Sequence, residues 1–323
     1  MKKSTRILLI LLGAVALLVA GNLFLRFRLP PVMVRAEPIP GLRIAGLQVT
    51  NALLTAFVVD LILITIAVAA TRRMHLVPTG LQNFVEWLIE TLYRVTESVA
   101  GPRWAPRFFA IVATIFLYVL VCNWFGLLPG LSAFGVIEEH AVVEGVVGHG
   151  VIQGAEQAPE RVIVPLFRSP STDLNNNFAL ALLSVMMTQV FGVIALGPRY
   201  FGRFFNLKGL IDAVRAARAP GKGSIRGLLG GLAFGLIDLA VGALEAVSEV
   251  AKVISFSFRL FGNIFAGEVM LLVLASLVPL VLTLPFLGLE VFVGLIQAFI
   301  FYILTLAFFT VATASHAHEE AGH

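Results

Sequence analysis

Seven charged side chains lie within one long apolar stretch between residues 228 and 314. Carboxylates at such positions can take up and release protons, whereas a guanidinium keeps its proton at any accessible pH. Each charge is costly at membrane depth unless it faces something polar, so we expect a water path or a polar partner surface beside them. The charged residues are Asp238, Glu245, Glu249, Lys252, Arg259, Glu268 and Glu290.

Most of these side chains share one face of a helix. At about 100° per residue, the polar positions from 238 to 263 fall within roughly 40° of a single line along the helix. Glu268 lies about 140° from that line and is expected to face a different wall. In the last apolar segment, Glu290 and Gln297 are seven residues apart and share a face. The line comprises Asp238, Glu245, Glu249, Lys252, Arg259 and Asn263.

Two interpretations of this stripe differ in what pairs with the charges. Glu249 and Lys252 have the spacing of a static ion pair that would hold helices together. Arg259 does not fit that interpretation, because its nearest acid on the stripe is ten residues away, about 15 Å along a helix. Since Arg259 is a fixed positive charge, we expect it to favour the ionised form of any carboxylate that passes beside it.

The composition indicates which kind of chain carries these residues. Of 323 residues 59% are apolar and 13% are charged, with a mean hydropathy of +0.94, whereas soluble domains have about 25% charged residues. A soluble enzyme, a disordered chain, a collagen and a coiled coil are therefore excluded. Cys122 is the single cysteine, which excludes an internal disulfide and a cysteine-based metal cluster.

The apolar windows predict an all-α polytopic membrane protein. About five core membrane helices are expected, together with an N-terminal hydrophobic segment at 7–25, which is either a signal anchor or a cleaved signal peptide. A helix over 228–278 would be about 75 Å long, so it must be broken or strongly tilted. The expected fold ends in two long, strongly tilted C-terminal helices. We expect residues 1–50 to form the hydrophobic segment with an external linker, and 51–323 the membrane domain. The core windows are 52–70, 108–128, 178–197 and 228–314, the last interrupted at Pro279 and Pro285.

Charge placement predicts the orientation. Basic residues gather at 72–107 and 199–226, which places both segments in the cytoplasm, and the acidic segment 129–172 then lies outside. Residues 26–50 do not fit this pattern, because they are basic although they would have to lie outside. Between the first two core spans, 79–98 alternates apolar and polar residues at helical spacing and predicts an amphipathic helix, lying on the inner surface or packed on other protein.

Two segments give a specific resemblance. Residues 255–268, SFSFRLFGNIFAGE, and 297–301, QAFIF, resemble subunit a of the F-type ATP synthase. Weaker similarity at 78–84, 123–130 and 171–177 extends the resemblance over about residues 50–313. It implies the stationary subunit beside the rotating c-ring, which carries ions through two offset half-channels and has no catalytic site of its own.

The resemblance also implies roles for individual residues. Arg259 matches the arginine that faces the ion-carrying carboxylate of the c-ring, and Asn263 and Gln297 match polar residues beside it. The other matched positions are Glu245, Glu268 and Glu290 along the half-channels and Asp173 with Asn175 at the external opening of the inlet.

Two departures from the family pattern affect the inlet. Members often carry a histidine at the position of Glu268 or of Glu290, so either acid remains open as the group that hands the proton to the ring. Gly126 occupies a position where some members have an aspartate.

The resemblance further implies the c-ring, peripheral-stalk b subunits and the lipid bilayer as partners, in a bacterial inner membrane with a cytoplasmic C-terminus. We expect no nucleic-acid partner, no cofactor, no metal, and no substrate other than H⁺ or Na⁺, a choice that the family places mostly in the ring. The alternative function is a secondary ion-coupled transporter, but the two related halves usual in such proteins are not evident.

Overall fold

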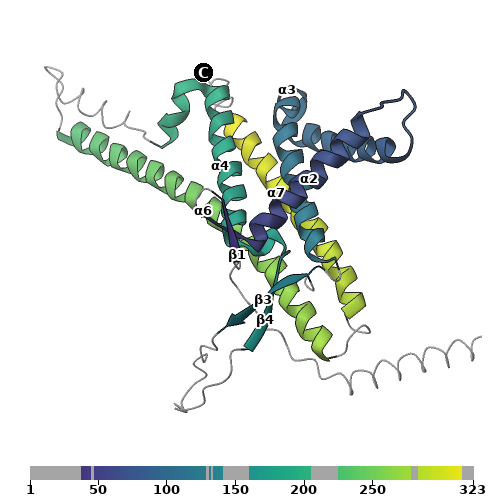
Figure 1. Cartoon of the computed structure of the whole chain (residues 1–323). Helices are drawn as coiled ribbons and strands as arrows, with labels where there is room; N and C mark the ends of the chain where they lie inside the picture. Colours follow the sequence, from purple (N-terminus) through teal and green to yellow (C-terminus); the bar gives the residue numbers. More distant parts are fainter. Residues whose placement is uncertain are drawn as a thin grey trace, which may run out of the picture. The chain divides into compact units, whose positions relative to one another are not determined.

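The computed structural model describes residues 38–44, 47–128, 131, 134–140, 160–204, 225–277 and 283–314 (Figure 1). Within these residues five helices are long and apolar enough to cross a membrane, which confirms the predicted all-α polytopic membrane protein. The N-terminal hydrophobic segment at 7–25 lies outside the described residues. The five helices are α2 (Asn51–Thr71), α3 (Gly80–Gly126), α4 (Leu174–Leu196), α6 (Ile225–Leu277) and α7 (Thr283–Ala314).

Helix α3 contains both the predicted amphipathic helix and the span that follows it. The two halves meet at Gly101, whose φ of 74° and ψ of 166° interrupt the helix. Glycine adopts this positive φ without the steric cost that a Cβ would bring. In the first half Phe84 and Trp87 are 57% and 60% exposed, while Gln82 is buried and bonded to Glu86 at 2.7 Å. Two large apolar side chains of this half are therefore exposed, and its position on the inner membrane surface stays a prediction.

Helix α6 is continuous over 53 residues. We expected this stretch to be either broken or tilted, and it is not broken. Its membrane-compatible part alone, Gly235–Ala275, has 41 residues and would be about 60 Å long, twice the thickness of a hydrocarbon core. For a helix of about 60 Å to stay within a hydrocarbon core of about 30 Å, its axis must be inclined by about 60° from the membrane normal.

Helix α7 begins earlier than the sequence suggested. Pro285 was expected to interrupt the apolar stretch, but it is the third residue of α7, which begins at Thr283. A proline in the first turn costs little because the amides there have no partner within the helix. The interruption therefore falls between Leu277 and Thr283, and Pro279 lies in that interval, outside the described residues.

Two short antiparallel ladders were not predicted. β1 (Pro38–Ile44) pairs with β2 (Leu47–Thr50) immediately before α2. β3 (Gly135–His140) pairs with β4 (Glu160–Pro165) inside the segment expected to be an external loop. Their pairing joins residues up to 30 positions apart, which helical periodicity cannot reveal.

The chain forms two compact units. The first unit contains the described residues of Met1–Arg72, Leu117–Asn176 and Phe261–Gln297; the second contains those of Arg73–Phe116, Asn177–Leu260 and Ala298–His323. The second unit has an aromatic core in which Phe108 lies 4.8 Å from Phe191 and 5.3 Å from Phe309, measured between ring centroids.

Candidate functional site

The first unit contains a cavity of about 220 Å³ lined by α3, the loop after β4, η2 (Pro170–Thr172), α6 and α7. Most of its wall is apolar, and its ionisable lining residues are Arg168, Glu268 and Glu290. A buried water needs roughly 10–15 Å³ of such volume, so several waters fit. The cavity can therefore bring water to two acids that the sequence analysis had assigned to the half-channels.

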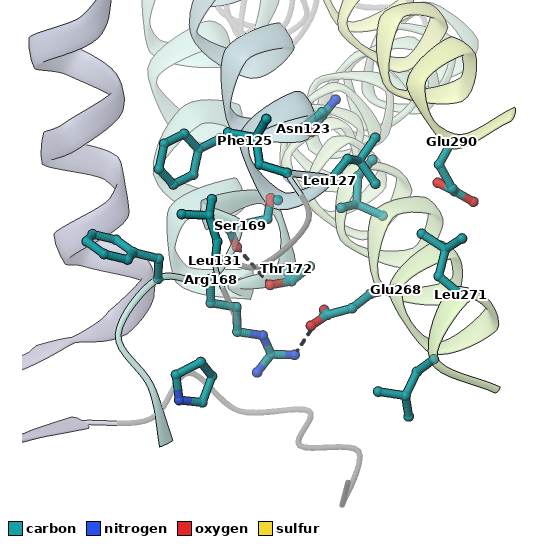
Figure 2. Close-up of a pocket in the computed structure, with 16 residues that line it drawn as sticks. Asn123, Phe125, Leu127, Leu131, Arg168, Ser169, Thr172, Glu268, Leu271 and Glu290 are labelled. Carbon is teal, nitrogen blue, oxygen red and sulfur yellow. Dashed lines mark hydrogen bonds and ion pairs between the residues drawn. The ribbon is translucent and has the colours of Figure 1, made fainter. Parts of the chain in front are cut away.

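The two acids differ in burial and in partner. Glu268 forms an ion pair with Arg168, with 3.2 Å between Oε2 and Nη2 (Figure 2). Its side chain is 45% exposed. Glu290 is 6% exposed, and among the described residues of its unit no cation lies within ion-pair distance of it. The sequence left open which acid passes the proton on, and these different surroundings distinguish them.

Glu290 reaches from α7 to the backbone of α6. Figure 2 shows its carboxylate directed toward α6, where a Cβ added to Gly267 would overlap the carboxylate atoms. The absence of a side chain at Gly267 therefore creates the space that the carboxylate occupies.

Backbone and side-chain hydrogen bonds hold the walls of the cavity together. Asn123 and Trp124 at the end of α3 donate to the carbonyl oxygens of Gly294 and Val291 in α7, each at 3.0 Å. Ser169 donates to the carbonyl of Cys122 at 2.9 Å, which ties the loop after β4 to α3. The helix that carries Glu290 and the loop that carries Arg168 are thus both fixed to α3 within this unit.

Gly126 also lines the cavity. A Cβ at this position would lie 2.6 Å from the Cβ of Ser169, closer than real Cβ contacts, so the loop after β4 occupies the space that a side chain would need. Aspartate, which some family members carry here, would not fit without moving this loop.

The amides beside the arginine position contact each other. Asn263 Nδ2 on α6 donates to Gln297 Oε1 on α7 at 2.8 Å. Gln297 is 3% exposed, while Asn263 is exposed. The bond orients the Asn263 amide at the surface of the first unit.

Asp173 and Asn175 lie at the start of α4 and do not line the cavity. Asp173 Oδ1 accepts a hydrogen bond from the backbone N–H of Asn175 at 3.0 Å, the contact of a helix N-cap. Asp173 therefore has a structural role in starting α4, and the exposed Asn175 is the residue open to solvent.

Arg259 belongs to the second unit. It is exposed on α6, and its guanidinium carbon lies 5.9 Å from the centroid of the Phe256 ring, one turn earlier. No carboxylate among the described residues of this unit forms an ion pair with it. The exposed apolar side chains Ile254 and Phe258, at 46% and 51%, lie on other sides of the helix, about 140° and 100° from Arg259. A permanent cation is thus exposed on α6, on the same line as Glu249 and Lys252.

Farther along the stripe, Glu249 and Lys252 form the static pair that their spacing allowed. Lys252 Nζ lies 2.7 Å from Glu249 Oε1 and 4.8 Å from the centroid of the Phe308 ring. Glu249 is 8% exposed. Glu245, one turn earlier, is half-buried in the same unit.

Arg168 lies in the segment 129–172, which was expected to be external, and it was not predicted as a site residue. The available signal was its position five residues before Asp173, within a stretch that resembles the family. Nothing in the local pattern indicates its partner, because Glu268 is 100 residues away.

The cavity contains acids that can exchange protons with water. The exposed Arg259 is a cation that can act on a partner's carboxylate. The family model described as ATP synthase A chain matches residues 52–310, which is most of the chain.

Proposed function

Because the chain belongs to the ATP synthase A chain family, we propose that it moves protons through two offset half-channels beside a rotating ring of c subunits. The family is the membrane-sector subunit of ATP synthase, a multi-pass membrane protein that translocates protons and is not itself catalytic. The proposal concerns the route through this chain and the roles of its residues.

The observation that carries the proposal is the placement of Arg259. Its side chain is exposed on α6, and no carboxylate among the described residues of its unit forms an ion pair with it. An exposed charge without a counter-ion is energetically costly at membrane depth unless a partner compensates it. A ring carboxylate that loses its proton beside Arg259 supplies this compensation, since an adjacent cation favours the ionised form.

The inlet half of the route uses the cavity of the first unit. A proton arrives from outside past Asp173 and Asn175, enters the water of the cavity beside Glu268 and Glu290, and from there reaches the ring. The ring carboxylate becomes a neutral carboxyl, which can face lipid at far lower cost than a carboxylate. Rotation of the ring then carries the proton away from the inlet.

The outlet half lies near Glu245. When the carboxyl completes its path through the lipid, it approaches Arg259 and releases its proton toward the inner side past Glu245. Asn263 and Gln297 flank the position at which the ring carboxylate meets the guanidinium. Because Arg259 cannot release its own proton, it also prevents protons from crossing directly between the two halves.

The driving force is the ion gradient. Each elementary charge that crosses 100 mV releases about 2.3 kcal/mol, which biases ring rotation in one direction. The whole assembly would include the peripheral-stalk b subunits and lie in a bacterial inner membrane, with the C-terminus of this chain in the cytoplasm. Residues 51–323 form the membrane domain in this assignment, and residues 1–50 precede it.

Replacing Arg259 tests this function. In membrane vesicles that contain the whole complex, Arg259→Ala should abolish ATP-driven and gradient-driven proton pumping, while the chain still copurifies with a ring of small subunits. The exposed Arg94, paired with Glu90 on α3, provides the control: Arg94→Ala should pump normally. Normal coupled pumping by the Arg259 variant would refute the role, and purification without a ring would favour a secondary transporter.

A further inference from the structure

Arg168 is a largely buried cation that forms an ion pair with an exposed acid. Its side chain is 9% exposed, whereas that of its partner Glu268 is 45% exposed. An arginine cannot become neutral, so its burial requires compensation by an anion or by several acceptors. Glu268 supplies an anion at 3.2 Å.

The position of Arg168 is set by the backbone around it. Its own N–H donates to Thr55 Oγ1 on α2 at 3.1 Å, and the next residue, Ser169, is bonded to α3. The nearby Pro165 carbonyl accepts from Asn51 Nδ2 at 3.2 Å. Anchored to two helices, the guanidinium is held at the wall of the cavity, where the dashed contact in Figure 2 joins it to Glu268.

The ionisable side chains that line the cavity carry unequal numbers of positive and negative charges when all are ionised. One cation faces two acids, and the ion pair uses the cation for Glu268. Protonating Glu268 would leave the buried Arg168 without this anion, which is unfavourable for a buried charge. Protonating Glu290 removes no ion pair, because no cation of the described part of its unit contacts it.

We propose that Arg168 is a positioning residue of the inlet, which holds Glu268 in an ion pair and leaves Glu290 as the acid that carries the proton. The inference rests on the proposed function and specifies its inlet. A hydrated proton in the cavity passes to the Glu290 carboxylate, and the resulting carboxyl passes it to a ring carboxylate. Arg168 and Glu268 keep their charges throughout this exchange.

A double-mutant comparison of proton flux through the whole complex in vesicles tests the pairing. Glu268→Gln removes a negative charge beside Arg168, so the more positive wall of the cavity repels incoming protons, and Arg168→Gln leaves a second carboxylate that competes for them. Each single change should lower flux about tenfold, the usual scale on which an adjacent charge alters proton occupancy. The double variant Arg168→Gln/Glu268→Gln should recover most of the flux. No recovery would overturn the proposal, because Glu268 would then take part in the transfer itself.

Two further variants separate positioning from folding. Arg168→Lys keeps a cation and should retain most of the flux, and the exchanged pair Arg168→Glu/Glu268→Arg should exceed either single neutral variant. Loss of flux in both, with normal amounts of chain in the purified complex, would contradict an electrostatic role. Glu290→Gln should abolish flux, and adding Arg168→Gln should not restore it.

The matched control is the Arg94–Glu90 pair on α3, whose atoms lie 2.6 Å apart and whose side chains are 74% and 63% exposed. Arg94→Gln, alone or with Glu90→Gln, should leave flux unchanged. If Arg259→Ala stops pumping but the double Arg168/Glu268 variant stays as slow as the singles, the inlet assignment fails and the proposed function stands. If Arg259→Ala pumps normally, the proposed function fails first.

Discussion

The carboxylate of Glu290 on α7 contacts the backbone of α6 at Gly267, in space that a single methyl group would occupy. Glu290 lines the cavity, and so does Glu268, which follows Gly267 directly in the chain. The location of the buried acid is thus determined by the absence of a side chain on the opposing helix. Steric changes at Gly267 can displace the carboxylate without altering any charge.

We expect Gly267→Ala to slow proton flux by about 10- to 100-fold, the cost of misplacing a reacting group by about an ångström. Stability should not fall, because alanine favours a helix over glycine by about 1 kcal/mol and the displaced atoms are the mobile end of a side chain. Flux and thermal stability of the purified complex are the two measurements.

Gly288→Ala on α7 is the control for this substitution, because nothing lies within 4 Å of a Cβ at that position. It should leave flux unchanged. Equal flux in the Gly267→Ala variant and the native complex would show that the exact position of the Glu290 carboxylate does not matter.

A second prediction concerns the fully buried Tyr302, which joins α7 to the amphipathic first half of α3. Its hydroxyl lies 2.7 Å from the Leu92 carbonyl and 2.7 Å from Thr96 Oγ1. Tyr302→Phe should lower the stability of the complex by about 0.6–1.7 kcal/mol, as for other hydrogen bonds between membrane helices. Chemical denaturation of the complex in detergent measures this change.

Thr114→Val provides the comparison for Tyr302→Phe. The Thr114 hydroxyl is exposed and donates only to the Ala110 carbonyl of its own helix, so stability should not change. A Tyr302→Phe complex as stable as the native one would mean that this contact does not join the two helices energetically.

A third prediction tests the orientation with cysteine labelling. The native Cys122 is completely buried, so it should react slowly with a membrane-impermeant maleimide. Asn175→Cys, at the exposed start of α4, should be labelled from outside, and the label should slow flux by obstructing the inlet. Ser98→Cys, at an exposed position of α3, should be labelled only from the cytoplasmic side. Labelling of both from the same side would contradict the proposed topology.

Much of the fold could be predicted from the sequence because it depends on local properties. The length of an apolar window and the 3.6-residue period indicate α2, α4 and the amphipathic part of α3 without any knowledge of their neighbours. The resemblance at residues 255–268 likewise identified the family that the match to residues 52–310 supports. The β3–β4 ladder was missed because its pairing joins residues up to 30 positions apart. Pro285 was misplaced because, in sequence, a proline in the first turn of a helix looks like a proline between two helices.

Only the tertiary structure distinguished the two acids of the cavity. Glu268 and Glu290 have the same side-chain chemistry. Their surroundings differ because Arg168, 100 residues earlier in the chain, pairs with Glu268, and because Gly267 leaves room for the Glu290 carboxylate. Helical period and hydropathy are properties of neighbouring residues along the chain. The energy of a buried charge depends instead on which distant groups the packing of helices brings within a few ångströms, so these relationships became visible only in three dimensions.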